Sequence, residues 1–245
     1  MTVLMGIATR LKLARLLWIA PDTGVVGDLA RPVFAGGADI IALADDPSHP
    51  IADDTAEEAL AGILEAARVT QGLSGYFGRT VSAAKLSPDV VVLVDPEANT
   101  ARARQLLGEW SVIGRECHDR AEVDAALADP CVDFLLVGPG LELVRYAASV
   151  APAHDPDAKP WFAVRGISAR SIDAVVRAGA MRVAVGHAIT HAEDPGEVAA
   201  QLKDALRVAW NADDRMEAVT MSAFGTSPKL TFPPAGTIPD TEIEL

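Results

Sequence analysis

The chain has 245 residues, of which 50% are hydrophobic and 22% are charged, and this size suits a single large α/β domain. Its formal net charge of −13 excludes nucleic acid and anionic membranes as expected partners, because a surface of that sign repels both. No apolar stretch approaches the roughly 20 residues of a transmembrane helix. The two cysteines, Cys117 and Cys131, are expected at opposite ends of the fold and make no disulfide framework, so we expect a cytoplasmic protein.

Eight apolar runs of strand type follow one another along the chain. In order they cover residues 15–20, 39–44, 75–77, 89–94, 110–115, 133–138, 161–166 and 182–186. Most are continuous apolar runs, which is typical of parallel strands buried on both faces. The third run is the weakest. The glycine-rich stretch around it, 72–78, predicts a shortened strand, with a contact for a partner as the alternative.

Helical patterns separate these strands. They are clearest over residues 55–72, 119–129, 168–180 and 194–210. The first begins with Thr55 and Glu58 in the spacing of a capping box. The last begins with Asp194 as the N-cap and Pro195 at the first helical position.

This alternation predicts a (β/α)8 TIM barrel over residues 1–212. The rival is a doubly wound open sheet, but its usual G-x-G-x-x-G signature is absent after the first strand, where the chain reads PDTGVVGD. Residues 213–245 are rich in Pro, Thr and Ser and show no helical or strand period. We expect an irregular C-terminal extension there, either flexible or docked on a protein partner or on a second subunit of a homodimer.

Three stretches carry a resemblance to a known family. They are GGADIIAL (36–43), VIGRECHDRAEVDAALADPCVDFLLVGP (112–139) and PWFAVRGISARSIDAVVRAGAMRVAVGHAI (160–189). Together they resemble the thiamine-phosphate synthase and thiazole tautomerase superfamily of small (β/α)8 barrels, over about residues 12–210. The third stretch is similar to the phosphate-binding half of that family and is the most specific of the three.

The resemblance implies a site for a phosphorylated small molecule after strands seven and eight. Its residues are Arg165, Gly166, Ile167, Val185, Gly186 and His187. In such barrels the loops after these two strands converge, and glycine there lets backbone N–H groups approach an oxyanion. Arg165 replaces a family glycine, so it either pairs with a phosphate or fills the pocket. Two glycine-containing turns that only close the barrel are the alternative.

Most catalytic positions of the synthase are changed in this sequence. The family holds its diphosphate leaving group with Mg²⁺ and with an Arg, a Lys and a Gln from strand two, and these three positions align with Ala44, Asp46 and Ala42. Further changes fall at Phe77, Gly78, Val94, Asp95, Glu116 and residues 143–146, where Arg145 is the one basic residue. Pro139 stands where the tautomerase relatives have a histidine. Because preorganised opposite charge supplies most of such catalysis, we expect weak or no synthase activity, as in a pseudoenzyme.

Acidic residues follow the strand ends instead. They are Asp22, Asp45, Asp46, Asp95, Glu97 and Glu116, and a barrel places them around one mouth. One interpretation is a divalent-cation site: Glu97 falls at the family's metal-ligand aspartate, which with Asp95 implies bound Mg²⁺. A general base is a related interpretation. The other is that these acids are simply solvated on loops.

A histidine pair suggests a second metal, which we do not expect. His187 and His191 have the one-turn spacing of a zinc pair, but Ala188 stands where the H-E-x-x-H motif has its glutamate.

Two functions from different classes therefore remain open. In one, the barrel binds a phosphorylated ligand of the thiamine pathway. In the other, it is a non-catalytic scaffold that engages a partner through its surface and C-terminal extension.

Overall fold

The computed structural model describes residues 6–21, 26–45, 51–95, 98–109 and 111–225, and it confirms the barrel. Eight parallel strands close into one sheet in chain order, and β8 pairs back onto β1. The strands are β1 (Leu16–Ala20), β2 (Ile40–Ala44), β3 (Leu73–Gly78), β4 (Val90–Leu93), β5 (Val112–Cys117), β6 (Phe134–Val137), β7 (Trp161–Val164) and β8 (Val183–Val185). All eight predicted strands are present, with ends shifted by a few residues.

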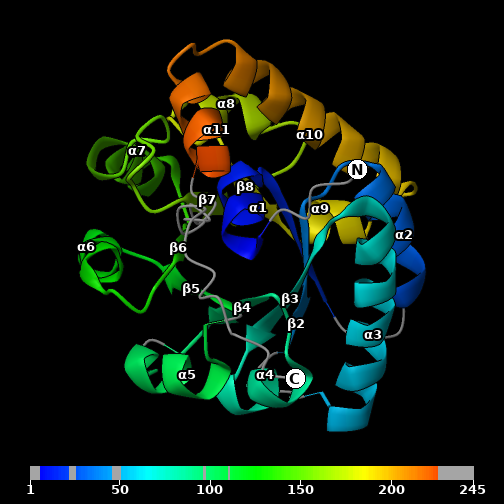
Figure 1. The fold of residues 1–245 in the computed structure, drawn as a ribbon. Coiled ribbons are helices and arrows are strands. Elements are labelled where there is room, and N and C mark those ends of the chain that lie inside the picture. The colour runs from blue at the N-terminus through cyan, green and yellow to red at the C-terminus, as the bar shows by residue number, and fades with distance from the viewer. Residues whose placement is uncertain (1–5, 22–25, 46–50, 96–97, 110, 226–245) are drawn as a thin grey trace, which may run out of the picture.

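Most of the helices surround the barrel as an outer ring, whereas α1 (Ile7–Leu13) lies across the middle of the barrel in Figure 1. The others are α2 (Val26–Ala35), α3 (Asp53–Thr70), α4 (Thr80–Leu86), α5 (Thr100–Leu107), α6 (Arg120–Ala128), α7 (Leu141–Val150), α8 (Ile172–Arg177), α9 (His187–Thr190), α10 (Pro195–Asn211) and α11 (Met216–Gly225). The predicted start of α10 is confirmed, because the Asp194 carboxylate accepts a hydrogen bond of 3.0 Å from the N–H of Glu197. None of the helices in the described segments is both long and apolar enough to cross a membrane.

Apolar side chains fill the barrel, and α1 closes its amino-terminal end. The inner layer includes Leu17, Ile40, Ala42, Leu73, Val90, Val92, Phe134, Leu136, Phe162 and Ala184. Leu11 and Ala14 pack onto this layer, and α1 lies across the middle of the barrel in Figure 1. The rings of Phe134 and Phe162 pack edge to face with centroids 5.9 Å apart. Because α1 covers the amino-terminal end, the carboxyl end of the strands is the end left open for a ligand.

The prediction of a shortened third strand is wrong. β3 pairs with β2 and β4 over its six residues and is an interior strand of the sheet. A Cβ added at Gly75 would lie 2.8 Å from the Cβ of Ala42 in β2. Glycine there permits close packing of neighbouring strands, although it lowers the strand propensity of the sequence.

The predicted capping box is also wrong. α3 begins at Asp53 with Ala52 at the N-cap position. Thr55 lies inside the first turn, where its N–H and hydroxyl both donate to the Asp54 carboxylate.

Part of the expected irregular extension is a helix. α11 buries Met216, Val219 and Ala223, and the Thr9 hydroxyl of α1 donates to the Ala223 carbonyl at 2.9 Å. The sequence MEAVTMSAFG is apolar on most of its circumference, so it lacks the one-sided pattern by which amphipathic helices are recognised. Residues 226–245, the remainder of the predicted extension, lie outside the described residues.

The two cysteines lie where the sequence predicts. Cys117 ends β5, Cys131 precedes β6, and both thiols are free.

Candidate functional site

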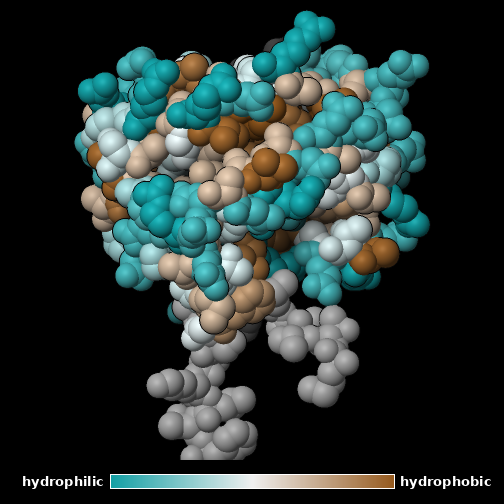
Figure 2. All heavy atoms as spheres, turned by 90° about the horizontal axis from the view of Figure 1, so that it is seen from above, coloured by the Kyte–Doolittle hydropathy of each residue, from teal (hydrophilic) through white to brown (hydrophobic). Residues whose placement is uncertain are grey.

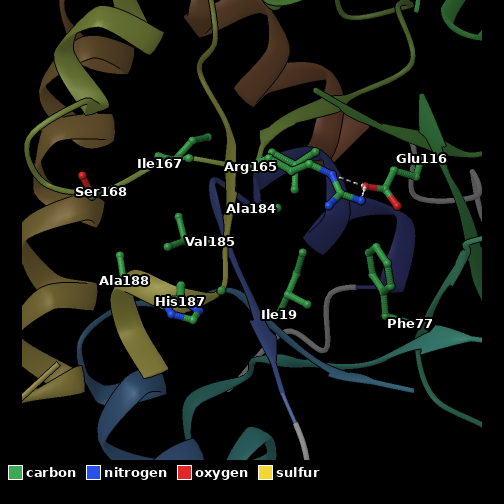
Figure 3. A pocket seen from close by; sticks show the side chains of 13 residues that line it. Ile19, Phe77, Glu116, Arg165, Ile167, Ser168, Ala184, Val185, His187 and Ala188 are labelled. Atoms are coloured by element: carbon green, nitrogen blue, oxygen red, sulfur yellow. Dashed lines mark hydrogen bonds and ion pairs between the residues drawn. The ribbon is translucent and has the colours of Figure 1, made fainter. Parts of the chain in front are cut away.

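A cavity of about 640 Å³ opens at the carboxyl ends of the strands (Figure 3). It is lined by Ile19, Phe77, Glu116, Val164, Arg165, Gly166, Ile167, Ser168, Ala184, Val185, Gly186, His187 and Ala188. All six residues of the predicted phosphate site are among them. The fold thus gathers these residues around one space, while phosphate binding by them stays a prediction.

The turn after β7 has a left-handed backbone. Arg165 and Gly166 have φ angles of 72° and 69°, a region that glycine adopts freely and arginine does not. A Cβ added at Gly166 would meet no atom within 4 Å, so the missing side chain leaves open space. The Ser171 hydroxyl braces the turn by accepting from the N–H of Ser168 and donating to the Gly166 carbonyl, both at 3.0 Å.

The turn after β8 approaches β1 closely. A Cβ added at Gly186 would lie 3.3 Å from the Ile19 carbonyl oxygen. The Gly186 carbonyl accepts hydrogen bonds of 3.1 Å from the N–H groups of Ile189 and Thr190. Because the first N–H groups of a helix have no acceptor within it, those of His187 and Ala188 are candidate donors to an anion. The two turns together form what we call the cradle, residues 166–168 and 186–188.

An ion pair spans the mouth of the barrel beside the cradle. Nε and Nη2 of Arg165 donate to one carboxylate oxygen of Glu116, at 3.0 and 2.6 Å. The Glu116 side chain is 6% exposed and that of Arg165 54%. In Figure 3 the Arg165 side chain extends toward Glu116 and away from His187 and Ala188. In the structure the charge of Arg165 is met by the Glu116 carboxylate, and its pairing with a phosphate stays a prediction.

The remaining wall of the cavity is mainly apolar. Ile19, Phe77 and Ala184 come from three strands, and Val185 and Ile167 extend the apolar surface. Phe77 stands where the resemblance places an asparagine of the synthase. This wall suits a flat apolar group more than a second charged one.

The interpretation of the strand-end acids as solvated residues is wrong for Glu116 and for Asp45. Asp45 is 2% exposed and does not line the cavity. Its carboxylate accepts hydrogen bonds from the Tyr76 hydroxyl and, at 2.9 Å, from the N–H of Ile51, and Arg79 lies 3.7 Å away. Burial and the hydrogen bond to Asp45 raise the pKa of the Tyr76 phenol well above its usual range. Through these contacts Asp45 holds the chain that follows β2 in position.

The predicted Mg²⁺ ligands gain no support from the described residues. Asp95 is exposed, and Glu97, like Asp22 and Asp46, falls outside the described residues. Within the described segments no three His, Cys, Asp or Glu side chains are grouped so that they could hold a metal ion. Mg²⁺ binding by Asp95 and Glu97 stays a prediction.

The histidine pair and Arg145 each have a partner. The rings of His187 and His191 stack with centroids 3.9 Å apart. Arg145, the one basic residue of 143–146, pairs with Glu142 on the surface of α7 at 2.5 Å. Arg145 does not line the cavity, so it supplies no cation opposite the cradle.

Sequence reasoning missed the ion pair and the apolar wall. Glu116 and Arg165 are separated by 49 positions, and no local pattern connects them. The apolar wall could have been predicted, because alternate residues of a strand point to the same side. Ile19 lies two positions after Leu17 and Phe77 four positions after Leu73, so all four point into the barrel.

A closed eight-stranded barrel with its cavity at the carboxyl end defines a TIM barrel of the kind whose ligands bind among the βα loops. Within that class the chain belongs to the thiamine monophosphate synthase family, which it matches over residues 28–189. A thiamine-phosphate synthase of Saccharopolyspora erythraea is 36% identical over 82% of this chain and 96% of its own, and that of Mycolicibacterium gilvum is 37% identical over 76% and 83%. Thiamine phosphate pyrophosphorylase from Pyrococcus furiosus superposes with a TM-score of 0.70 at 21% identity, covering 82% of this chain and 98% of that one, a likeness of fold alone.

Proposed function

We propose that the protein binds a phosphorylated heteroaromatic compound of the thiamine pathway in the cavity at the barrel mouth and is weak or inactive as a synthase. One observation carries this proposal: two glycine-containing turns and an apolar wall face each other across a single cavity. Family membership supports the choice of pathway, because the similar proteins are named thiamine-phosphate synthases.

The phosphate would lie in the cradle. Backbone N–H groups at residues 166–168 and 186–188 suit an oxyanion, since glycine lets the ligand come close and the donors need no reorganisation. The ring of the ligand would rest on Ile19 and Phe77, which line the same cavity. A thiazole that carries one phosphate has both parts.

Loss of diphosphate displacement follows from the charges around the cavity. Arg165 is the one arginine or lysine among the described lining residues, and Glu116 neutralises it. A departing diphosphate gains negative charge, and one missing donor in such a site typically costs about 2.7–4 kcal/mol of transition-state stabilisation. Bound Mg²⁺ would supply positive charge, and Asp95 and Glu97 are the residues we propose to hold it.

A thermal-shift screen tests the binding proposal. Thiazole phosphate, thiamine phosphate and inorganic phosphate are each added with and without Mg²⁺. We expect stabilisation by thiazole phosphate, because a ligand that binds only the folded state raises the unfolding temperature. Flat curves at millimolar concentrations would argue against ligand binding, and rapid formation of thiamine phosphate from pyrimidine diphosphate and thiazole phosphate would contradict the loss of catalysis.

A scaffold role is the second candidate, and exposed apolar residues favour it. Met221 and Phe224 of α11 are 66% and 55% exposed, and Val208 of α10 is 62% exposed. Figure 2, seen from above the view of Figure 1, shows apolar residues among the hydrophilic ones of this face. A chain cut after residue 225 keeps α11 on α1 and tests residues 226–245 alone. Loss of a co-purifying partner, or of a homodimer in size-exclusion chromatography, would support this role.

Both roles are proposed for the cytoplasm. The free thiols of Cys117 and Cys131 are consistent with a reducing compartment.

A further inference from the structure

We propose that Glu116 controls anion binding in this cavity by holding the guanidinium of Arg165 away from the cradle. The proposal rests on the proposed function, because it assumes that the cradle receives an anion. It assigns Glu116 a role that the family resemblance does not, since the family has a serine at that position.

The geometry of the pair suggests competition for one cation. Both contacts from Arg165 converge on a single oxygen, Oε1 of Glu116, so the Nε and Nη2 edge of the guanidinium faces β5 rather than the cradle. The Arg165 side chain starts from the residue next to Gly166, at the edge of the cradle. An anion in the cradle and the Glu116 carboxylate are thus both within reach of the same side chain.

Burial decides which partner Arg165 prefers when no anion is bound. The Glu116 side chain is 6% exposed, so without Arg165 its charge would be poorly hydrated and would lose the cation that pairs with it. Arg165 has the opposite environment: at 54% exposure it can be solvated when unpaired. An incoming phosphate must therefore take the guanidinium from a buried carboxylate or share it through the remaining N–H groups.

The arrangement also selects among anions. A ligand with one phosphate in the cradle and an apolar ring on Phe77 keeps its negative charge on one side of the cavity. A second phosphate would extend toward the Glu116 side, where like charges repel. The cavity thus favours phosphate monoesters over diphosphates, and Glu116 is the residue that sets the preference.

Calorimetric titration of inorganic phosphate and of inorganic diphosphate, at constant ionic strength, tests this on five proteins. They are wild type, Glu116→Gln, Arg165→Gly, the double variant of these two, and Glu116→Asp. We expect Glu116→Gln to bind phosphate about ten-fold more tightly, the scale of one charge-assisted hydrogen bond, and to gain more for diphosphate. Arg165→Gly should weaken binding. In its background Glu116→Gln should bring no gain for phosphate, and for diphosphate only the smaller gain that comes from removing like-charge repulsion. Glu116→Asp, which keeps the charge, should behave like wild type. Unfolding curves establish that each variant is folded.

Each outcome separates the two proposals. If wild type binds phosphate and Glu116→Gln binds it no more tightly, control by Glu116 is refuted while ligand binding stands. If Glu116→Gln gains affinity for inorganic phosphate equally with and without Arg165, the effect is simple repulsion and the holding of Arg165 is refuted. Binding by Glu116→Gln but not by wild type supports control and contradicts the proposed function; binding by none of the proteins contradicts both.

Discussion

The hydroxyl of Tyr76 donates a hydrogen bond to the carboxylate of Asp45, and both side chains are almost completely buried between the barrel and its helices. Asp45 is the first of the two acids that end the stretch DIIALADD, residues 39–46. Its carboxylate holds strand β3 and Ile51 in place and does not line the cavity.

Removing this hydrogen bond is expected to destabilise the fold. Tyr76→Phe leaves a buried carboxylate oxygen without its donor, which typically costs about 1–3 kcal/mol. Tyr146→Phe is the matched control, because its hydroxyl also donates to an aspartate, Asp124, but on the surface. Urea unfolding should show a clearly larger loss for Tyr76→Phe; equal losses would contradict the structural role of Asp45.

A second prediction concerns the effect of the left-handed backbone of Arg165 on stability. Arg165→Ala leaves Glu116 buried without its cation and keeps a non-glycine residue at φ 72°. Arg165→Gly loses the same ion pair but removes the strain, which is worth about 1 kcal/mol. We expect Arg165→Gly to be the more stable of the two by that amount in urea unfolding, and the reverse order would show that the turn is not strained.

The buried thiol of Cys117 should make the stability of the fold depend on pH in the alkaline range. Burial, followed by the nearby Glu122 carboxylate, raises the pKa of the Cys117 thiol to about 12. Between its ordinary pKa near 9 and about 12, the folded state keeps a proton that the unfolded state loses, so the stabilisation is complete below pH 9 and declines above it. The stability difference between wild type and Cys117→Ala should be constant from pH 7 to 8 and then shrink by at most about 1.4 kcal/mol per pH unit. A difference that does not change up to pH 11 would contradict this.

Removal of α11 should damage the barrel more than removal of residues 226–245. A chain cut after residue 212 loses the buried Met216, Val219 and Ala223. With them go the packing of Met216 and Val219 against Trp210 and the hydrogen bond from Thr9 of α1 to Ala223. Burying a Val or Met side chain contributes about 1.5–3 kcal/mol, so we expect a loss of roughly 3 kcal/mol or more relative to a chain cut after residue 225. Similar unfolding curves for the two truncated chains would show that α11 does not stabilise the barrel.

The sequence was sufficient for the barrel but not for its site. The strands were recognisable because parallel strands buried on both faces are continuously apolar, as in β4 and β6. The length of β3 is underestimated from its sequence, because its glycines suggest a weak strand when read alone. Gly75 is needed for close packing against Ala42 of β2, a contact that only the paired strands reveal. For the same reason the cradle was located from local motifs, whereas the pair between Glu116 and Arg165 required the closed barrel. α11 was missed because its apolar residues are not confined to one side.

Ligand binding at the cradle is tested most directly by titrating thiazole phosphate into the wild-type protein and into two variants in a calorimeter. Ala188→Leu fills the cavity from its lining, and Ala192→Leu makes the same change on a neighbouring surface that does not line it. We predict saturable binding to wild type and to Ala192→Leu and its loss in Ala188→Leu. No binding to any of the three, or equal binding to all three, would contradict the assignment of the ligand to this cavity.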